Sequence, residues 1–272
     1  METQTDHDAK IEEGWRNFLE KGEFKSEIRQ RRLFRFLPSE PRCKFCNAPF
    51  HGAGGVLCRV LLDKSPSRYN PRLCNVCERY AADNLGGAEI ELSMLFADVR
   101  GSTKLAEQLS TTEFSRLISR FYQAGTDVMV NSDAMVDKLI GDEITGLYTP
   151  GLTGPDHARV AIEAAKLLLT VTGHTDREGP WVPVGVGVHT GEAFVGAVGS
   201  EQGLTDITTL GDAPNTAARL ASVAATGEIV VSEAAAQAAN LDTSELEGRS
   251  LDLKGKSEPV AVHVIRIQPD TH

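Results

Sequence analysis

Residues 93–103 read Ser-Met-Leu-Phe-Ala-Asp-Val-Arg-Gly-Ser-Thr, and this stretch decides what kind of domain surrounds it. The apolar run from Ile90 to Ala97 predicts a buried strand. Asp98 ends that strand, and the turn Gly101-Ser102-Thr103 leads into a helix. A carboxylate at a strand end, beside backbone N–H groups, can hold a divalent cation and face phosphate oxygens.

Strand and helix patterns alternate after this stretch, which predicts an α/β or α+β domain. A second carboxylate, Asp142, follows Gly141 at the tip of a predicted tight hairpin between strands at 135–140 and 143–148. That tip can lie beside the end of the first strand. Further predicted elements are helices over 110–128, 156–169 and 214–222 and strands over 182–189, 193–198 and 229–231.

Asp98 and Asp142 each have a simpler interpretation. Asp98 fits a helix N-cap and Asp142 fits an ordinary turn residue, because Asp favours both positions for backbone reasons. Considered together, they bring two carboxylates within reach of one or two Mg²⁺ ions.

Five motifs in one order resemble the class III nucleotidyl cyclases, the adenylate and guanylate cyclases. The resemblance runs from about Ser93 to Val264 and implies a ferredoxin-like (βαββαβ) α+β domain with extra C-terminal strands and helices. Each motif alone is weak, and the five in register are specific. They are Phe-Ala-Asp-Val-Arg-Gly-Ser-Thr (96–103), Lys-Leu-Ile-Gly-Asp (138–142), Gly-Val-Gly-Val-His-Thr-Gly-Glu (185–192), Leu-Gly-Asp-Ala-Pro-Asn-Thr-Ala-Ala-Arg (210–219) and Leu-Lys-Gly-Lys (253–256).

The resemblance implies attack of a ribose 3′-oxygen on its own α-phosphate, with loss of pyrophosphate. Asp98 and Asp142, helped by the Val99 carbonyl, would then carry two Mg²⁺ or Mn²⁺ ions. Asn215 would orient the ribose and Arg219 would contact the α-phosphate. The two are four residues apart, so on a helix they project from the same face.

Further positions bear on the substrate. Lys138 matches the adenine-contacting Lys of the family, and Thr208 stands where many members have Asp and one bicarbonate-stimulated branch has Thr. Guanylate cyclases are expected to have Glu and Cys at these positions, which favours ATP over GTP. Backbone N–H groups of Gly101, Ser102 and Thr103 face phosphate in this interpretation, and Lys254 is a candidate for the triphosphate.

A single cyclase domain that carries both the metal carboxylates and the base-contacting set implies a homodimer with two equivalent sites. This sequence departs from the family pattern at two positions. One is Thr208, and the other is Pro214, beside Asn215, where the family usually has an aliphatic residue. Pro214 puts the start of the following helix, and so the position of Asn215, in question.

All five cysteines lie between residues 43 and 77, and four of them form two CxxC pairs. The order of a knuckle, a hairpin over 52–62 and a helix after the second pair resembles a treble-clef zinc finger. Zn²⁺ and an iron–sulfur cluster both remain open, with Cys58 as the odd thiol in a strand and His51 as an alternative ligand. The four predicted ligands are Cys43, Cys46, Cys74 and Cys77.

The whole chain is expected to comprise an N-terminal helical segment (1–38), the Cys-rich module (39–85), a linker (86–90) and the cyclase domain (91–268). In the first segment Ile11, Trp15, Phe18 and Leu19 form an amphipathic docking stripe.

Charge and composition exclude several classes of function. Residues 1–84 carry 15 basic and 12 acidic side chains, whereas the 272-residue chain has a net charge of −10, so the remainder is strongly acidic. This charge distribution disfavours nucleic acid as a partner. A solvated or dimer-docking helix face explains the side chains of the basic run as well as phosphate contacts do; these are Arg29, Arg31, Arg32 and Arg35. No apolar run approaches a membrane span, and a cytoplasmic protein is expected. The alternatives to an adenylate cyclase are a guanylate cyclase and a catalytically weak cyclase-like signalling module regulated through the Cys-rich region.

Overall fold

The computed structural model describes residues 4–37, 41–200, 204–253 and 258–267. The chain forms two compact units, and strands β1 (Gly86–Val99) and β4 (Val184–Gly199) contribute residues to both. The predicted domain boundaries stay predictions. The first unit contains Met1–Glu91, Thr149–Gly154 and Glu192–Gly211, and the second contains Leu92–Tyr148, Pro155–Gly191 and Asp212–His272.

The first unit begins with the predicted docking stripe. Helix α1 (Gln4–Arg16) continues into the π-helical turn η1 (Asn17–Lys21), and Trp15, Phe18 and Leu19 are buried. The Trp15 indole donates a hydrogen bond to the carbonyl of Asn84, 3.1 Å away. The stripe therefore docks within the chain, as an amphipathic face at this spacing does.

Helix α2 (Lys25–Phe34) carries the basic run, and one of its arginines corrects the sequence expectation. Arg31 is only 2% exposed, and its guanidinium donates to the carbonyl of Phe45 at 3.1 Å. The interpretation as a solvated or dimer-docking side chain is therefore wrong for Arg31, because this arginine binds the knuckle of the Cys-rich region.

The segment between the two cysteine pairs differs from its prediction. Residues 52–62 form helix α3 (Gly52–Leu62), not a hairpin, and α4 (Asn75–Asp83) begins at the second pair as predicted. A Cβ atom on Gly55 would lie 2.5 Å from the carbonyl carbon of Phe50. Glycine at this position lets α3 pack closely against the backbone of Phe50. In the sequence, the same run of glycines is typical of a turn.

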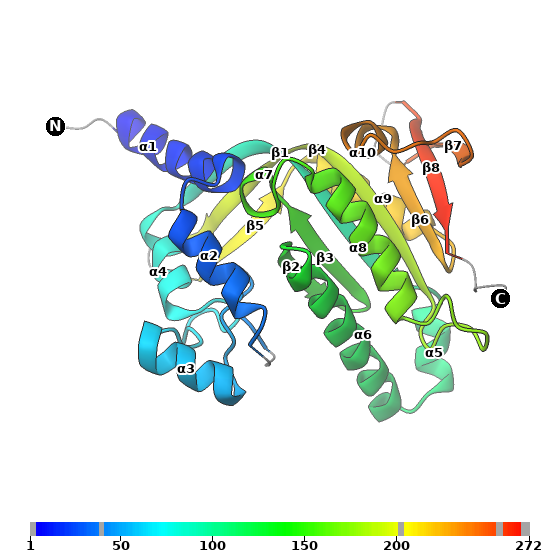
Figure 1. Cartoon of the computed structure of the whole chain (residues 1–272), viewed down its shortest axis with the longest axis horizontal. Coiled ribbons are helices and arrows are strands. Elements are labelled where there is room, and N and C mark those ends of the chain that lie inside the picture. Colours follow the sequence, from blue (N-terminus) through cyan, green and yellow to red (C-terminus); the bar gives the residue numbers. More distant parts are fainter. Residues whose placement is uncertain (1–3, 38–40, 201–203, 254–257, 268–272) are drawn as a thin grey trace. The chain divides into compact units, whose positions relative to one another are not determined.

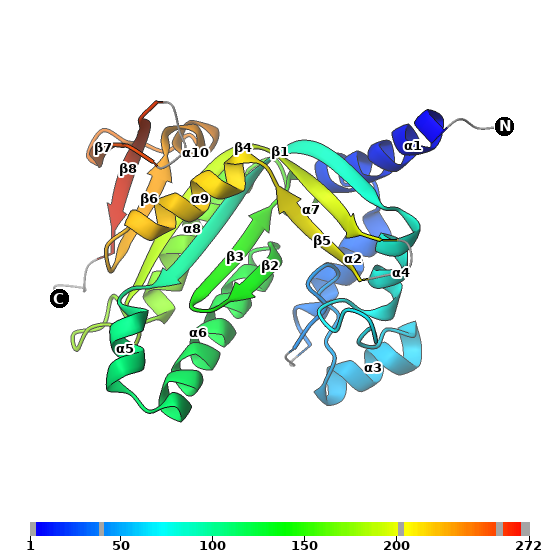
Figure 2. The same ribbon diagram turned by 180° about the vertical axis from the view of Figure 1, so that it is seen from behind.

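Residues 86–90, expected as a linker, are the first residues of β1. A Cβ atom on Gly87 would meet the carbonyl oxygen of Val195 at 2.4 Å, so glycine allows β1 to approach β4 closely. The first unit also contains α7 (Pro150–Thr153) and β5 (Thr205–Leu210). Strand β5 pairs antiparallel with the end of β4 (Figure 2).

Within the described residues, the strands follow the order β2-β3-β1-β4-β6-β8-β7, and β5 pairs with β4 off this path. The β1, β2, β3 and β4 strands, with helices α6 and α8, form the βαββαβ unit that the family resemblance implies. The α+β expectation is confirmed. The remaining bounds are α5 (Ser102–Gln108), α6 (Thr111–Asn131), β2 (Met135–Ile140), β3 (Glu143–Tyr148), α8 (His157–Val171), α9 (Asp212–Val223), β6 (Glu228–Ser232), α10 (Glu233–Ala238), β7 (Glu247–Leu251) and β8 (Val260–Arg266).

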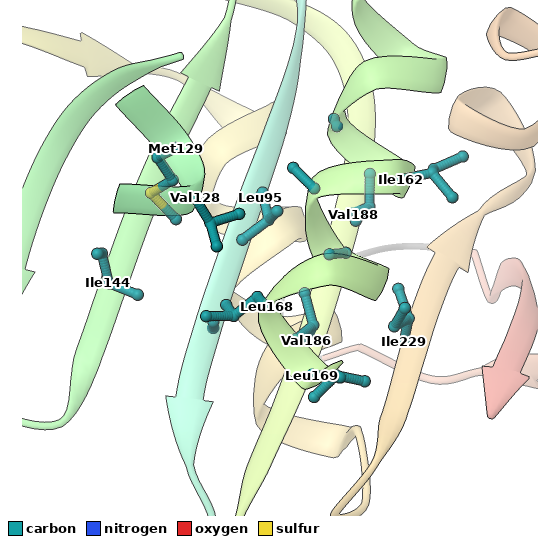
Figure 3. Packing of buried hydrophobic residues seen from close by; sticks show 14 of the residues in the cluster. Leu95, Val128, Met129, Ile144, Ile162, Leu168, Leu169, Val186, Val188 and Ile229 are labelled. Carbon is teal, nitrogen blue, oxygen red and sulfur yellow. The ribbon is translucent and has the colours of Figure 1, made fainter. Parts of the chain in front are cut away.

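The core of the second unit lies between this sheet and helices α6 and α8, which cover one of its faces (Figure 1). Helix α6 begins at the predicted capping box, in which Ser110 and Glu113 bond each other's backbone N–H groups. Leu95 of β1 and Leu168 of α8 are fully buried between the layers (Figure 3). Burial of this apolar surface supplies most of the stabilisation of the sheet.

Strand β4 has valines on one face and glycines on the other. Val184, Val186 and Val188 join the core under α6 and α8, whereas on the other face Gly187 lies against α9 and Gly185 against Ala224, the residue that follows α9. A Cβ atom on Gly187 would lie 2.3 Å from the backbone nitrogen of Ala221 in α9. The glycines thus permit α9 to lie directly on the strand (Figure 2).

We predict that Gly187→Ala lowers the free energy of unfolding by about 1–3 kcal/mol, because its methyl group has to displace the α9 backbone. Gly248→Ala is the control, since a Cβ atom there meets nothing within 4 Å. The control should change stability by no more than about 0.5 kcal/mol. Equal urea unfolding midpoints for the two variants would contradict the close approach of α9 to β4.

Candidate functional site

Asp98 and Asp142 lie beside each other at one end of the sheet. Asp98 pairs with Glu143 in the antiparallel register of β1 and β3, and the Val99 N–H donates to the carbonyl of Asp142 at 3.1 Å. The hairpin tip therefore meets the end of the first strand, as the sequence predicts. Carboxylate and carbonyl oxygens are the ligands that Mg²⁺ prefers, so these two residues offer suitable donor types at this end of the sheet.

Arg100 is a member of this site that sequence reasoning missed. Its guanidinium forms an ion pair with the Asp98 carboxylate and also donates to the carbonyl of Ser222 at 2.8 Å. Burial lowers the pKa of Arg100, although the carboxylates of Asp142 and Glu143 oppose this shift. A cation that binds Asp98 would therefore compete with a guanidinium already in contact with it.

The turn after Asp98 leads into helix α5, as predicted. Gly101 adopts a left-handed conformation (φ 67°), and the helix begins at Ser102 and continues through Thr103. A side chain at position 101 would be strained, so glycine is the residue that this turn requires. The three residues lie directly after the strand end that carries Asp98 and Val99.

The electrostatic environment at the hairpin tip is negative. Burial raises the pKa of Glu143, and the charge of Asp142 adds to this effect. The hydroxyl of Tyr122 donates to the carbonyl of Gly141 at 2.8 Å, which holds the tip against α6. A bound cation would relieve the repulsion between the neighbouring Asp142 and Glu143 carboxylates.

Asn215 and Arg219 both lie on α9, one turn apart. Asn215 is exposed and Arg219 is half-buried, so both side chains reach the surface of the helix. The helix begins at Asp212, two residues earlier than predicted, and Pro214 lies in its first turn. Proline is tolerated there because a first-turn N–H has no partner within the helix.

Lys138 and Thr208 lie on strands. Lys138 is on β2, after a bulge at Asp137, and its ammonium is 3.8 Å from the Asp137 carboxylate. Thr208 is on β5, opposite Gly196 of β4, and is half-buried. Lys254, the candidate for the triphosphate, lies outside the described residues.

The four predicted cysteine ligands converge in the first unit. The sulfur atoms of Cys43, Cys46, Cys74 and Cys77 all lie within 4.8 Å of one another, and Cys46 and Cys74 are 3.8 Å apart. Around one tetrahedral ion with Zn–S bonds of about 2.3 Å, sulfur atoms are about 3.8 Å apart. An iron–sulfur cluster would separate the thiolates further, because several iron and sulfide atoms lie between them.

Hydrogen bonds orient these thiols. The backbone N–H groups of Cys74 and Cys77 donate to the sulfur atoms of Cys43 (3.3 Å) and Cys74 (3.5 Å). Hydrogen bonds among the four thiols hold the pKa of Cys74 well below its usual value and raise the pKa of Cys46 and Cys77 well above it, so the cluster favours a thiolate at Cys74. The Lys64 ammonium lies 3.8 Å from the Cys46 sulfur. A thiolate is the form that binds metal, so this environment suits a metal ion.

Cys58 and His51 lie outside this four-cysteine group. Cys58 lies in α3 rather than in the predicted strand, where it is 1% exposed and burial raises the pKa of its thiol. His51 precedes the first residue of α3 and is exposed. Cys58 thus behaves as a small apolar residue.

Among the described residues, no helix is long and apolar enough to cross a membrane.

Two proteins that resemble this chain in sequence are named adenylate cyclases. An adenylate cyclase of Anabaena cylindrica is 28% identical over 186 residues, which cover 64% of this chain and 36% of the relative. An adenylate cyclase of Mycobacterium tuberculosis is 30% identical over 170 residues, covering 61% of this chain and 37% of the relative. The chain thus spans little more than a third of the length of these relatives.

Solved structures share the fold. The guanylyl cyclase Cya2 superposes with a TM-score of 0.60 at 25% identity, over 69% of this chain and 98% of that one. The adenylyl cyclase CyaB of P. aeruginosa gives a TM-score of 0.57 at 22% identity, over 68% and 98%. Residues 88–266 match the family model of the adenylate and guanylate cyclase catalytic domain, and the chain belongs to that family.

Proposed function

We propose that the protein is an adenylate cyclase that converts ATP to 3′,5′-cyclic AMP and pyrophosphate. The observation that carries this proposal is the contact between the two strand ends, where the N–H of Val99, the residue after Asp98, donates to the carbonyl of Asp142. Its family membership supplies the reaction class, and these carboxylates supply the means to hold nucleotide-bound metal.

Each residue has a distinct task in this proposal. Asp98, Asp142 and the Val99 carbonyl would hold two Mg²⁺ or Mn²⁺ ions, which supply charge neutralisation and activation of the 3′-oxygen when bound. Asn215 orients the ribose so that its 3′-oxygen lies in line with the α-phosphate. Arg219 donates to the α-phosphate oxygens as negative charge develops there and the bond to pyrophosphate breaks.

The choice of ATP rests on Lys138 and Thr208. An ammonium donates to adenine N1, whereas it meets a second donor at guanine N1–H, and a threonine hydroxyl can accept from the adenine amino group. The half-exposed position of Lys138 on β2 leaves its ammonium accessible to a ligand. Proteins similar to this chain are named both adenylate and guanylyl cyclases. The proposal that ATP is the substrate therefore rests on the side chains of Lys138 and Thr208.

We further propose that the active protein is a homodimer. In the family resemblance, one chain supplies Asp98 and Asp142, and its partner supplies Lys138, Thr208, Asn215 and Arg219. Because this chain has both sets, two copies related by a two-fold axis would build two equivalent sites.

For the cysteines we propose a single structural Zn²⁺. The 3.8 Å separation of the Cys46 and Cys74 sulfur atoms fits one tetrahedral ion. A chain segment with a small core gains folding free energy when four thiolates close around a metal.

The first test of function compares nucleotides. We expect kcat/KM for ATP to exceed that for GTP by at least about fivefold, since one mismatched hydrogen-bond pair costs about 1–3 kcal/mol. The double variant Lys138→Glu, Thr208→Cys should shift the preference toward GTP. Product formation with Mg²⁺ and with Mn²⁺ measures both, and equal rates for the two nucleotides would refute the assignment of Lys138 and Thr208.

The dimer has a test of its own. Asp98→Ala and Arg219→Ala should each be inactive, but an equimolar mixture should recover about a quarter of the wild-type rate. Half of randomly mixed dimers are heterodimers, and one of their two sites is intact. A mixture of Asp98→Ala with Asp142→Ala is the matched control and should stay inactive, because both changes affect the same set. Recovery in the control mixture, or none in the first, would contradict the shared site.

Metal analysis tests the cysteine site. We expect about one Zn²⁺ per chain in a colourless protein. Cys74→Ser should lose most of this zinc and unfold at a lower temperature. Cys58→Ser is the control and should keep its zinc, because Cys58 is not among the four converging cysteines. Iron in the purified protein, with visible absorption, would identify a cluster in place of zinc.

A further inference from the structure

The Cys-rich module makes a direct contact with strand β5, on which Thr208 lies. The ammonium of Lys44, which stands between Cys43 and Cys46, is 2.7 Å from the Asp206 carboxylate. Asp206 is two residues before Thr208 on the same strand. Successive side chains of a strand alternate, so Asp206 and Thr208 share one face, about 6.8 Å apart along the strand.

A second contact comes from the other cysteine pair. The side-chain nitrogen of Asn70, four residues before Cys74, donates to the same Asp206 oxygen at 3.0 Å and to the carbonyl of Thr205 at 3.1 Å. The side-chain oxygen of Asn70 accepts from the Arg72 N–H at 3.1 Å. The amide of Asn70 therefore donates two hydrogen bonds through its nitrogen and accepts one through its oxygen, which defines its orientation.

The two donors in these contacts are buried. The Lys44 side chain is only 4% exposed and Asn70 is 5% exposed, whereas the Asp206 side chain is 34% exposed. An ammonium that has lost its water depends on its carboxylate partner, and removal of that partner leaves a buried charge. The same Asp206 oxygen also accepts from the backbone N–H of Ile207 at 3.0 Å, so the carboxylate is joined to the strand itself.

Strand β5 depends on such support. Within the described residues, its strand pairing is with β4 alone, and helix α4 of the Cys-rich module packs against it. A strand paired on one edge can shift or fray more readily than one paired on both. Lys44 and Asn70 therefore hold β5 at its first two residues, Thr205 and Asp206.

We infer that Lys44, Asn70 and Asp206 are positioning residues for Thr208, so that an intact metal-bound Cys-rich module sets the affinity of the cyclase for its nucleotide. Lys44 adjoins Cys43, and Asn70 lies in the turn that leads to Cys74, so closure of the four thiolates around a metal orders both contacts at once. This inference rests on the proposed function, because it takes Thr208 as a base-contacting residue.

The test uses the full chain with its metal. Asp206→Ala and Lys44→Met should retain about one zinc per chain, since neither residue is a ligand. Both should raise KM for ATP by about fivefold, which corresponds to about 1 kcal/mol, and change kcat by less than about twofold. Asp242→Ala is the matched control, because the exposed Asp242 carboxylate also accepts a local backbone N–H but belongs to a loop of the second unit.

Hydrogen exchange gives a readout that does not need activity. Amides of residues 205–210 should exchange faster in Asp206→Ala, and in wild-type protein stripped of metal by a chelator, than in the zinc-bound wild type. Asp242→Ala should leave these amides unchanged. If Asp206→Ala does not fold, Asp206→Asn, which keeps the size of the side chain, takes its place in the comparison.

The outcomes separate the two proposals. A wild-type protein without cyclase activity would refute the proposed function, whereas the exchange measurement would still report on the contact with β5. An active protein in which zinc-bound Asp206→Ala keeps wild-type KM and wild-type exchange at 205–210 would refute the positioning role. Unchanged KM and exchange after metal removal would refute the link to the cysteines.

Discussion

The register between β1 and β3 is the constraint on which the rest of the site depends. Because Asp98 pairs with Glu143, the Val99 N–H meets the carbonyl of Asp142, and the backbones of two acidic residues from distant parts of the sequence come together. A shift of one residue would move alternate side chains to the other face and separate these two groups. The buried residues of β1, packed under α6 and α8, hold the register in place.

The other candidate site residues are positioned by packing of a different kind. Helix α9 carries Asn215 and Arg219, and it can lie on β4 because Gly185 and Gly187 leave room for its backbone. Thr208 is held instead through β5, where Lys44 reaches Asp206 from the Cys-rich module. Small residues thus position one part of the proposed site, and in our inference the Lys44–Asp206 ion pair positions another.

The sequence predicted the elements with strong local signals. The apolar run before Asp98 and the Gly141-Asp142 turn gave the strand and the hairpin correctly. The prediction failed for 52–62 and 86–90, since glycines there serve close packing against Phe50 and Val195, which a turn signal does not distinguish. Arg100 and Lys44 were missed as contacts because each meets a carboxylate that only the tertiary structure brings near, although Lys44 stands inside a CxxC pair.

The central claim is that Asp98 and Asp142 hold the metal ions that accompany the nucleotide. A crystal structure with Mn²⁺ and a non-reactive ATP analogue, with the ions located by anomalous scattering, tests it most directly. The account predicts two manganese peaks between these two carboxylates, with the Asp98–Arg100 ion pair opened and the analogue's phosphates on the metals. Manganese bound to the nucleotide alone, with Asp98 still paired to Arg100, would contradict it.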